Sequence, residues 1–137
     1  MQNAVNLIFN ILKNDSVLMG LLGNAKTVSS QNWNRIYQTP NAPYPEEMPR
    51  ITMFEVINDD AVSADNRPLF SDVNIRIDIW LKEYQNLYAI TKRVKKLIVD
   101  NFGMCRVQII ETLFETDIKV YHKPINVYLL LEQESEI

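Results

Sequence analysis

The chain has 137 residues, of which 47% are hydrophobic and 23% charged, and this composition predicts a single globular domain over residues 1–137. The net charge of -3 at pH 7 excludes a protein whose whole surface attracts nucleic acid, because such surfaces carry a basic excess. A single cysteine excludes an internal disulfide, and no apolar run reaches the roughly 20 residues that predict a membrane span.

Two helical segments open the chain. Residues 3–13 carry apolar side chains at spacings of three and four, which is typical of an amphipathic helix laid on a sheet. Asp15 and Ser16 are good N-caps for a short second helix over 17–22, and Gly23 would end it. A short strand over 35–37 is expected to follow.

Prolines dominate the next segment. Residues 39–49 contain four of the six prolines of the chain, and each removes a backbone donor and restricts φ. This composition predicts an extended arm or loop without regular secondary structure.

Two β-rich segments surround a polar stretch. Residues 50–57 are rich in β-branched and aromatic side chains, and residues 72–81 alternate strictly between polar and apolar. The alternation predicts a strand with one face on a core and the other on water or a partner. Between the two, residues 58–68 are rich in Asp and Asn, which favour local turns, so we expect a long polar hairpin loop there.

The second half of the chain predicts one helix and two strands. Residues 83–100 place their apolar side chains on one helical face and most lysines off it. Strands are expected over 106–115 and 125–132, separated by 116–119 and followed by a flexible tail over 133–137. The elements predict the α+β class, with two main helices packed on one face of a mostly antiparallel sheet of about four strands.

Residues that could carry catalysis are sparse. His122 is the only histidine, so any Ser-His-Asp or Cys-His arrangement would depend on it, and we expect a structural or exposed role instead. One histidine and Cys105 are too few for the usual zinc sites, and the three glycines form no nucleotide-binding loop. We therefore expect no enzyme activity, no catalytic residues, no metal and no cofactor.

One catalytic alternative stays open. Asp117 and Lys119, together with Asp78 or Glu111 on neighbouring strands, could mimic the two acids and the lysine of a small metal-dependent nuclease. An acid and a lysine two positions apart arise easily by chance, so a solvated strand end is the simpler interpretation.

Two charged clusters have similar alternatives. Asp59, Asp60 and Asp65 could bind calcium, but the glycine and terminal glutamate of the helix-loop-helix pattern are absent, which favours a solvated loop. The basic run over 92–96 is best interpreted as the solvated face of a helix, although it could contact an acidic protein or passing DNA.

The order and spacing of these segments carry a family resemblance. Its parts are the first helix, Asp15-x-x-Leu18-x-x-Leu21-Leu22-Gly23, Arg35-Ile36-Tyr37, the proline-rich loop, Glu47-Met48-Pro49-Arg50-Ile51-Thr52, Val73-x-Ile75-x-Ile77-Asp78-Ile79-Trp80 and the helix that follows. Over nearly the whole chain, this order resembles the tail-terminator (tail-completion) proteins of long-tailed bacteriophages and prophages.

The resemblance implies a structural virion protein without enzymatic activity. It implies a homo-hexameric ring on the head-proximal end of the tail tube, which ends tube polymerisation and forms the docking surface for the head connector. The implied partners are further copies of the chain, the tail tube protein and the head–tail connector, with DNA passing through the lumen without sequence recognition and no membrane. Assembly would take place in the cytoplasm of the bacterial host. The alternatives are a head–tail adaptor or stopper, the tube subunit itself, or the nuclease.

A ring constrains where the candidate interface residues lie. Closure by rotation requires two unlike surfaces on each subunit, which meet head to tail. The sequence offers candidates in the proline arm (Pro40, Pro43, Tyr44 and Pro45), in the polar hairpin (Asp59, Asp60, Asp65 and Arg67) and on the polar strand face (Arg76 and Asp78). Arg76 and Asp78 could pair within the sheet or line a lumen.

Overall fold

The computed structural model describes residues 4–23, 35–39, 48–64 and 67–132. In chain order its elements are α1 (Ala4–Lys13), α2 (Ser16–Leu21), β1 (Ile36–Tyr37), β2 (Arg50–Ala64), β3 (Arg67–Leu81), the 3-10 turn η1 (Tyr84–Asn86), α3 (Leu87–Asn101), β4 (Cys105–Ile109), β5 (Leu113–Glu115) and β6 (Val120–Glu132). The predicted α+β class is confirmed.

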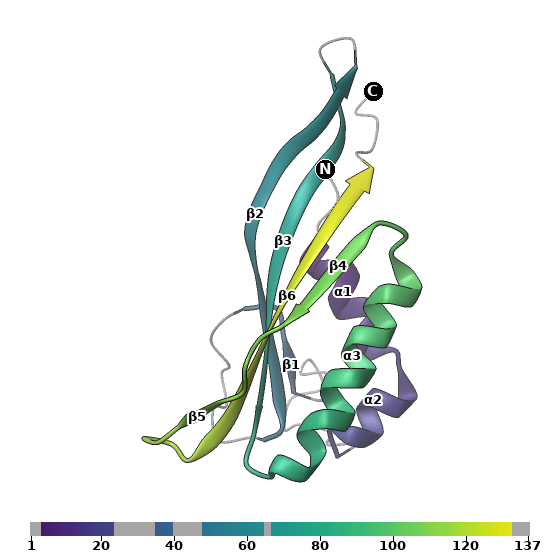
Figure 1. Cartoon of the computed structure of the whole chain (residues 1–137). Helices are drawn as coiled ribbons and strands as arrows, with labels where there is room; N and C mark the ends of the chain where they lie inside the picture. Colours follow the sequence, from purple (N-terminus) through teal and green to yellow (C-terminus); the bar gives the residue numbers. More distant parts are fainter. Residues whose placement is uncertain (1–3, 24–34, 40–47, 65–66, 133–137) are drawn as a thin grey trace.

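The strands form one sheet in the order β1-β2-β3-β6-β4, and β5 pairs with β6 beyond the end of β4. Only the β1–β2 pair is parallel, so the sheet is mostly antiparallel as expected. It has six strands among the described residues, where about four were expected. The helices lie together on one side of the sheet, and the other side carries none of them (Figure 1).

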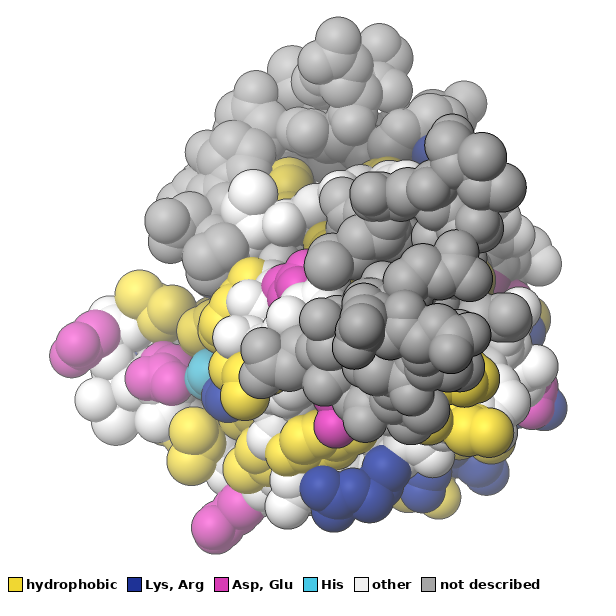
Figure 2. Space-filling model, turned by 90° about the horizontal axis from the view of Figure 1, so that it is seen from above, with side chains coloured by type: hydrophobic (Ala, Val, Ile, Leu, Met, Phe, Trp, Pro, Cys, Tyr) yellow, Lys and Arg dark blue, Asp and Glu magenta, His cyan; other side chains and the backbone are white. Residues whose placement is uncertain are grey.

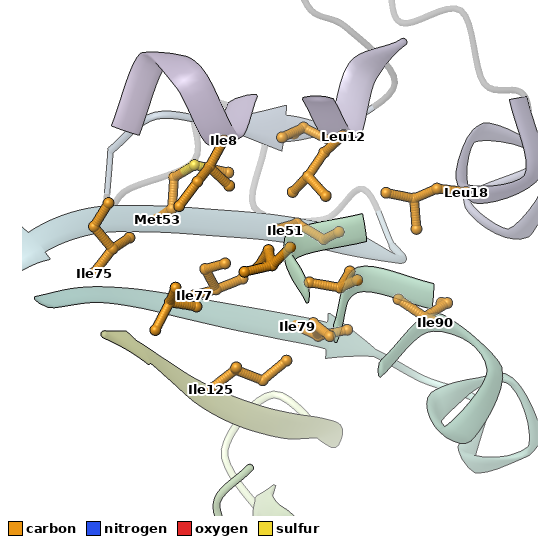
Figure 3. Close-up of a cluster of buried hydrophobic side chains, with 14 of the residues drawn as sticks. Ile8, Leu12, Leu18, Ile51, Met53, Ile75, Ile77, Ile79, Ile90 and Ile125 are labelled. Carbon is orange, nitrogen blue, oxygen red and sulfur yellow. The ribbon is translucent and has the colours of Figure 1, made fainter. Parts of the chain in front are cut away.

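The strict alternation of β3 separates the core from the opposite face. Its apolar side chains at positions 73, 75, 77, 79 and 81 are at most 2% exposed. In Figure 3, Ile8 and Leu12 of α1 and Ile90 of α3 lie on the side of the sheet that carries Ile77 and Met53. The core is therefore the layer between the helices and the sheet.

The polar stretch 58–68 corrects one expectation. The two strands of the hairpin continue through most of it, with Ala64 paired to Arg67 across the tip. Turn-favouring Asp and Asn residues are held in strands here because the cross-strand ladder pairs their backbone groups, and β propensity depends strongly on such context. The stretch forms a two-stranded ribbon that extends past the rest of the sheet (Figure 1).

A β-bulge changes which side chains of β2 face the core. The register with β3 shifts between Glu55 and Ile57. Because a bulge adds one residue, it breaks the period of two. Val56 and Ile57 are consequently 49% and 51% exposed, although strict alternation would place Ile57 beside the core residue Met53.

The strands of the second half also differ from expectation. The predicted strand over 106–115 is interrupted at 110–112, and β6 begins at Val120 and runs through Pro124. The carbonyl of Pro124 accepts a hydrogen bond from the backbone N–H of Ile110 at 3.0 Å. In an antiparallel strand, the N–H and the C=O of one residue point to the same side. The N–H that Pro124 lacks would therefore point toward the gap between β4 and β5. The proline therefore costs the sheet no regular ladder bond.

Asp15 joins α2 to α3. Its carboxylate accepts a hydrogen bond from the backbone N–H of Leu18 at 2.8 Å, as an N-cap does. Arg93 of α3 donates two further hydrogen bonds to it, at 2.8 and 2.6 Å. The hydrogen bonds from Arg93, followed by that from Leu18, hold the pKa of Asp15 below its usual value against the opposing effect of burial.

We expect Asp15→Ala to lower the free energy of unfolding by about 1–2 kcal/mol at neutral pH, mainly through the lost cap. Asp15→Asn keeps a capping side chain and should cost less. Because the folded-state pKa lies below the unfolded value of about 3.8, the stabilisation is present above that pH and is lost as pH falls through the folded pKa.

Urea denaturation of both variants from neutral pH into acid measures this effect. The matched control is Asp100→Ala, which removes the exposed pair of Lys96 and Asp100 and should cost about 0.5 kcal/mol or less. If the difference in free energy of unfolding between wild type and Asp15→Ala did not become smaller in acid, the ionised Asp15 carboxylate would not be the stabilising group.

Candidate functional site

A network of linked side chains lies on the face of the sheet opposite the helices. We call it the polar cluster, and its members are Thr52 of β2, Arg76, Asp78 and Trp80 of β3, Glu115 of β5 and His122 of β6. The strand register places Thr52 beside Asp78 and Trp80 beside His122. The cluster therefore connects four strands across one face.

Asp78 is the centre of this cluster. Its Oδ1 atom accepts a hydrogen bond from Arg76 Nε at 3.0 Å and lies 2.6 Å from His122 Nε2. The other ring nitrogen of His122 lies 3.2 Å from Glu115 Oε1. An imidazolium can donate to both carboxylates, whereas a neutral ring can donate to only one. Asp78 and His122 are buried, so their partners replace water as hydrogen-bonding groups.

Trp80 is held on three sides. Its ring stacks on His122 with centroids 3.8 Å apart and planes inclined by 8°. Its indole N–H donates to Thr52 Oγ1 at 3.1 Å, and the guanidinium of Arg50 lies 5.1 Å from the ring centroid. Aromatic stacking and the cation–π contact fix the ring without leaving its polar atom unpaired.

The geometry suits a clamp between strands better than a catalytic relay. Among the described residues, the hydrogen-bonding neighbours of His122 are carboxylates, and no hydroxyl or thiol hydrogen-bonds to its ring. A nucleophile activated by a histidine has to lie within hydrogen-bonding reach of it. The described part of the chain thus shows no nucleophile–histidine pair.

The residues of the nuclease alternative are divided between an exposed turn and the polar cluster. Asp117 and Lys119 lie in the exposed turn between β5 and β6, whereas Asp78 belongs to the polar cluster. No group of three or more His, Cys, Asp or Glu side chains in the described ranges is arranged to hold a metal ion. Within those ranges, no helix is both long enough and apolar enough to span a bilayer.

The predicted interface residues lie partly in the sheet, partly in the ribbon and partly outside the described residues. Arg76 and Asp78 pair with each other within the sheet, two positions apart on one strand, which is one of the two alternatives stated for them. Asp59 and Asp60 lie in β2 and Arg67 begins β3, so all three belong to the ribbon. Pro40, Pro43, Tyr44, Pro45 and Asp65 lie outside the described residues. Their roles at an interface stay predictions.

Sequence reasoning did not place four members of the cluster: Thr52, Trp80, Glu115 and His122. Trp80 has the same parity as Asp78 in the alternating strand, so its place on the polar face could have been predicted. The positions of Glu115 and His122 required the register of β5 and β6 and the early start of β6, which no local signal indicates.

A second feature is a groove of about 630 Å³ between α3 and the strands β4 and β6, which we call the α3 groove. Its lining includes the hydrophobic side chains Tyr84, Leu87, Tyr88, Val99 and Ile109 and the basic side chains Lys92, Lys95, Lys96 and Lys123. The predicted basic run is thus divided, because its lysines line the groove while Arg93 binds Asp15.

The fold is shared with a protein of a gene transfer agent. No protein-family model matches the chain, and no curated protein matches it. Among solved structures, one chain of the virion of a native gene transfer agent particle is similar, with a TM-score of 0.62 and 14% sequence identity. The match covers 96% of this chain and 100% of that chain. At this identity the likeness establishes a common fold.

Proposed function

We propose that the chain is a structural protein of a phage-like virion. In this proposal it forms a ring on the head-proximal end of a tail tube, ends tube polymerisation and provides the docking surface for the head connector. One observation carries the proposal: the fold matches a chain of a gene transfer agent virion over 96% of the length. The tail-terminator order of elements in the sequence supports it independently.

The surface of the sheet is compatible with repeated head-to-tail contacts. In the described residues β1 pairs with β2 only at Ile51 and Thr52, so most of β2 has no neighbouring strand on its outer side. The opposite border is formed by the short strand β4. A subunit of a closed ring needs two unlike surfaces, and these two borders differ in length and surroundings. Partner copies, the tube protein and the connector are the expected neighbours.

The polar cluster supports a structural role over an enzymatic one. Asp78 is hydrogen-bonded to Arg76 and His122, and His122 is also hydrogen-bonded to Glu115. These contacts link the strands to one another. A rigid face of this kind could line the lumen through which DNA passes without sequence recognition. The proposal assigns the chain no catalytic activity and no cofactor.

The test is light scattering over a wide concentration range, repeated with purified tail tubes and free tube subunits. We expect a particle of about six times the 16.0 kDa subunit mass that does not grow further, or capping that stops tube growth. Growth into open polymers would favour the tube subunit instead. A monomer that ignores tubes at every concentration would overturn the proposal.

A further inference from the structure

The rim of the α3 groove is aromatic and open to solvent. Tyr88 is 74% exposed and Tyr84 is 61% exposed, and both line the groove. Beyond Tyr84 the aromatic surface continues onto β5 and β6, since the Tyr121 ring lies 5.2 Å from the Tyr84 ring and 5.1 Å from that of Phe114. Phe114 is itself 49% exposed. Large apolar side chains that cluster in this way are typical of a surface that another molecule covers.

The inner part of the groove is aliphatic. Leu87 is buried, whereas Val99 of α3 and Ile109 of β4 are 49% and 40% exposed. The residues of α3 that line the groove from Tyr88 to Val99 recur at spacings of three and four, so the groove follows about three turns, or roughly 17 Å, of the helix. An apolar groove of this length matches the apolar face of a short amphipathic helix.

The α3 groove is basic although the chain as a whole carries a net charge of -3. Four lysines line it, namely Lys92, Lys95, Lys96 and Lys123, and the only acidic residue in its lining, Asp100, is bound by Lys96 at 2.8 Å. Lys92, Lys95 and Lys123 make no ion pair with any described residue. Figure 2 shows basic side chains gathered beside hydrophobic ones along one side of the molecule. The complementary ligand therefore carries acidic groups beside an apolar face.

We propose that the α3 groove binds an acidic amphipathic helix of a separate protein. The apolar face of that helix packs against Tyr88, Val99 and Ile109. Its Glu or Asp side chains pair with Lys92 and Lys95 at the rim. Buried apolar side chains supply most of the affinity in this mode of recognition, and charge complementarity at the rim fixes the orientation and speeds association. One subunit is enough for this contact, so it does not depend on the proposed ring.

A protein segment fits the groove better than nucleic acid does. Single-stranded nucleic acid stacks its bases on open faces of aromatic rings. In the groove Lys92 Nζ lies over the Tyr88 ring, 5.8 Å from its centroid. Tyr84 and Phe114 meet Tyr121 in edge-to-face geometry, so these rings already pack on one another. A phosphate backbone would contact the lysines but would leave the aliphatic lining exposed.

Fluorescence anisotropy with a synthetic probe tests the proposal on the full chain. The probe is a labelled helical peptide of about 15 residues, with Leu and Phe on one face and Glu on the other. We expect wild type to bind it with a dissociation constant of roughly 1–100 μM. Two control peptides, one with Lys in place of every Glu and one with Ser in place of every apolar residue, should each bind at least about tenfold more weakly.

Substitutions in the groove locate the binding site. Lys92→Glu with Lys95→Glu reverses the charge of the rim and should weaken binding of the Glu peptide by at least about tenfold. Tyr88→Ala removes an exposed ring and should weaken it by about fivefold or more. The matched charge control is Lys82→Glu with Lys119→Glu, two exposed lysines that do not line the groove, and it should leave binding within about twofold of wild type. Circular dichroism checks that these exposed substitutions keep the fold.

Several results would overturn the proposal. The groove is not such a site if wild type fails to bind the Glu peptide below about 1 mM, or if the groove variants bind it as well as wild type does. A DNA duplex of about 20 base pairs that binds more tightly than the peptide and displaces it would assign the groove to nucleic acid. Loss of self-association in Lys92→Glu with Lys95→Glu, measured by light scattering, would make the groove an interface between copies.

The chain's own acidic end is the remaining competitor for the groove. Residues 133–137 contain two Glu residues. If a chain that ends at Glu132 bound the peptide at least about tenfold more tightly than the full chain, the segment 133–137 would be the occupant and the proposal would be wrong. Ring formation is measured separately, by light scattering of wild type, so a failed peptide experiment leaves the proposed function standing.

Discussion

Asp78→Ala is expected to lower the free energy of unfolding by about 2–4 kcal/mol, because it removes the acceptor shared by the buried His122 ring and the partly exposed Arg76 guanidinium. The substitution leaves His122 Nε2 and Arg76 Nε without the oxygen that lies 2.6 and 3.0 Å from them. Asp78→Asn keeps one amide oxygen at the same place and should cost less than half as much.

Urea denaturation of the purified variants measures this difference. Glu55→Ala is the matched control, since Glu55 is exposed and makes no ion pair with a described residue, and it should change stability by about 0.5 kcal/mol or less. Trp80 stacks on His122, so its fluorescence, measured in a Trp33→Phe background, reports whether the cluster has loosened. Equal stabilities for Asp78→Ala and Glu55→Ala would show that the cluster does not clamp the sheet.

Ile77→Ala is expected to cost about 3–4 kcal/mol, through lost burial and the cavity left behind. Ile77 precedes Asp78 on the same strand but faces the helices, and its side chain is completely buried. It lies on β3, with Met53 and Ile125 as its register partners on the strands to either side, so the surrounding backbone has little freedom to collapse into the gap.

A graded series checks the mechanism. Ile77→Val removes one methyl group and should cost about 1 kcal/mol. Val17→Ala, on the exposed side of α2, should stay within about 0.5 kcal/mol of wild type. If Ile77→Ala matched Val17→Ala in a denaturation curve, the packing shown in Figure 3 would be contradicted.

These two neighbouring residues show what the sequence could predict. Ile77 and Asp78 were placed on opposite faces correctly, because the period of two is a local property of an extended chain. The helices over 3–13 and 83–100 were found for the same kind of reason, since their apolar stripes recur at helical spacing.

Features that depend on strand register could not be predicted from the sequence. Trp80 and His122 are neighbours across β3 and β6, yet alternation alone predicts parity and not which residues meet. The composition of 58–68 predicted a loop where the structure has paired strands, for a related reason. A long cross-strand ladder overrides the local preference of Asp and Asn for turns.

The α3 groove shows the same limit for a helix. Lys92 and Lys95 were interpreted as a solvated face, and both are indeed exposed. The helical pattern cannot indicate that Ile109 and Lys123, from two later strands, form the other wall. A concave surface is made by elements that are distant in sequence, so its recognition required the structure.

The place of β6 in the sheet has a consequence for synthesis on the ribosome. Among the described strands β6 is made last, yet it lies between β3 and β4 and is also the partner of β5. Translation adds only about 5–20 residues per second, so the edge of β3 that pairs with β6 stays open for roughly seconds. A nascent chain that ends before residue 120 cannot complete the sheet, and premature contacts between such chains are a risk that rapid insertion of β6 removes.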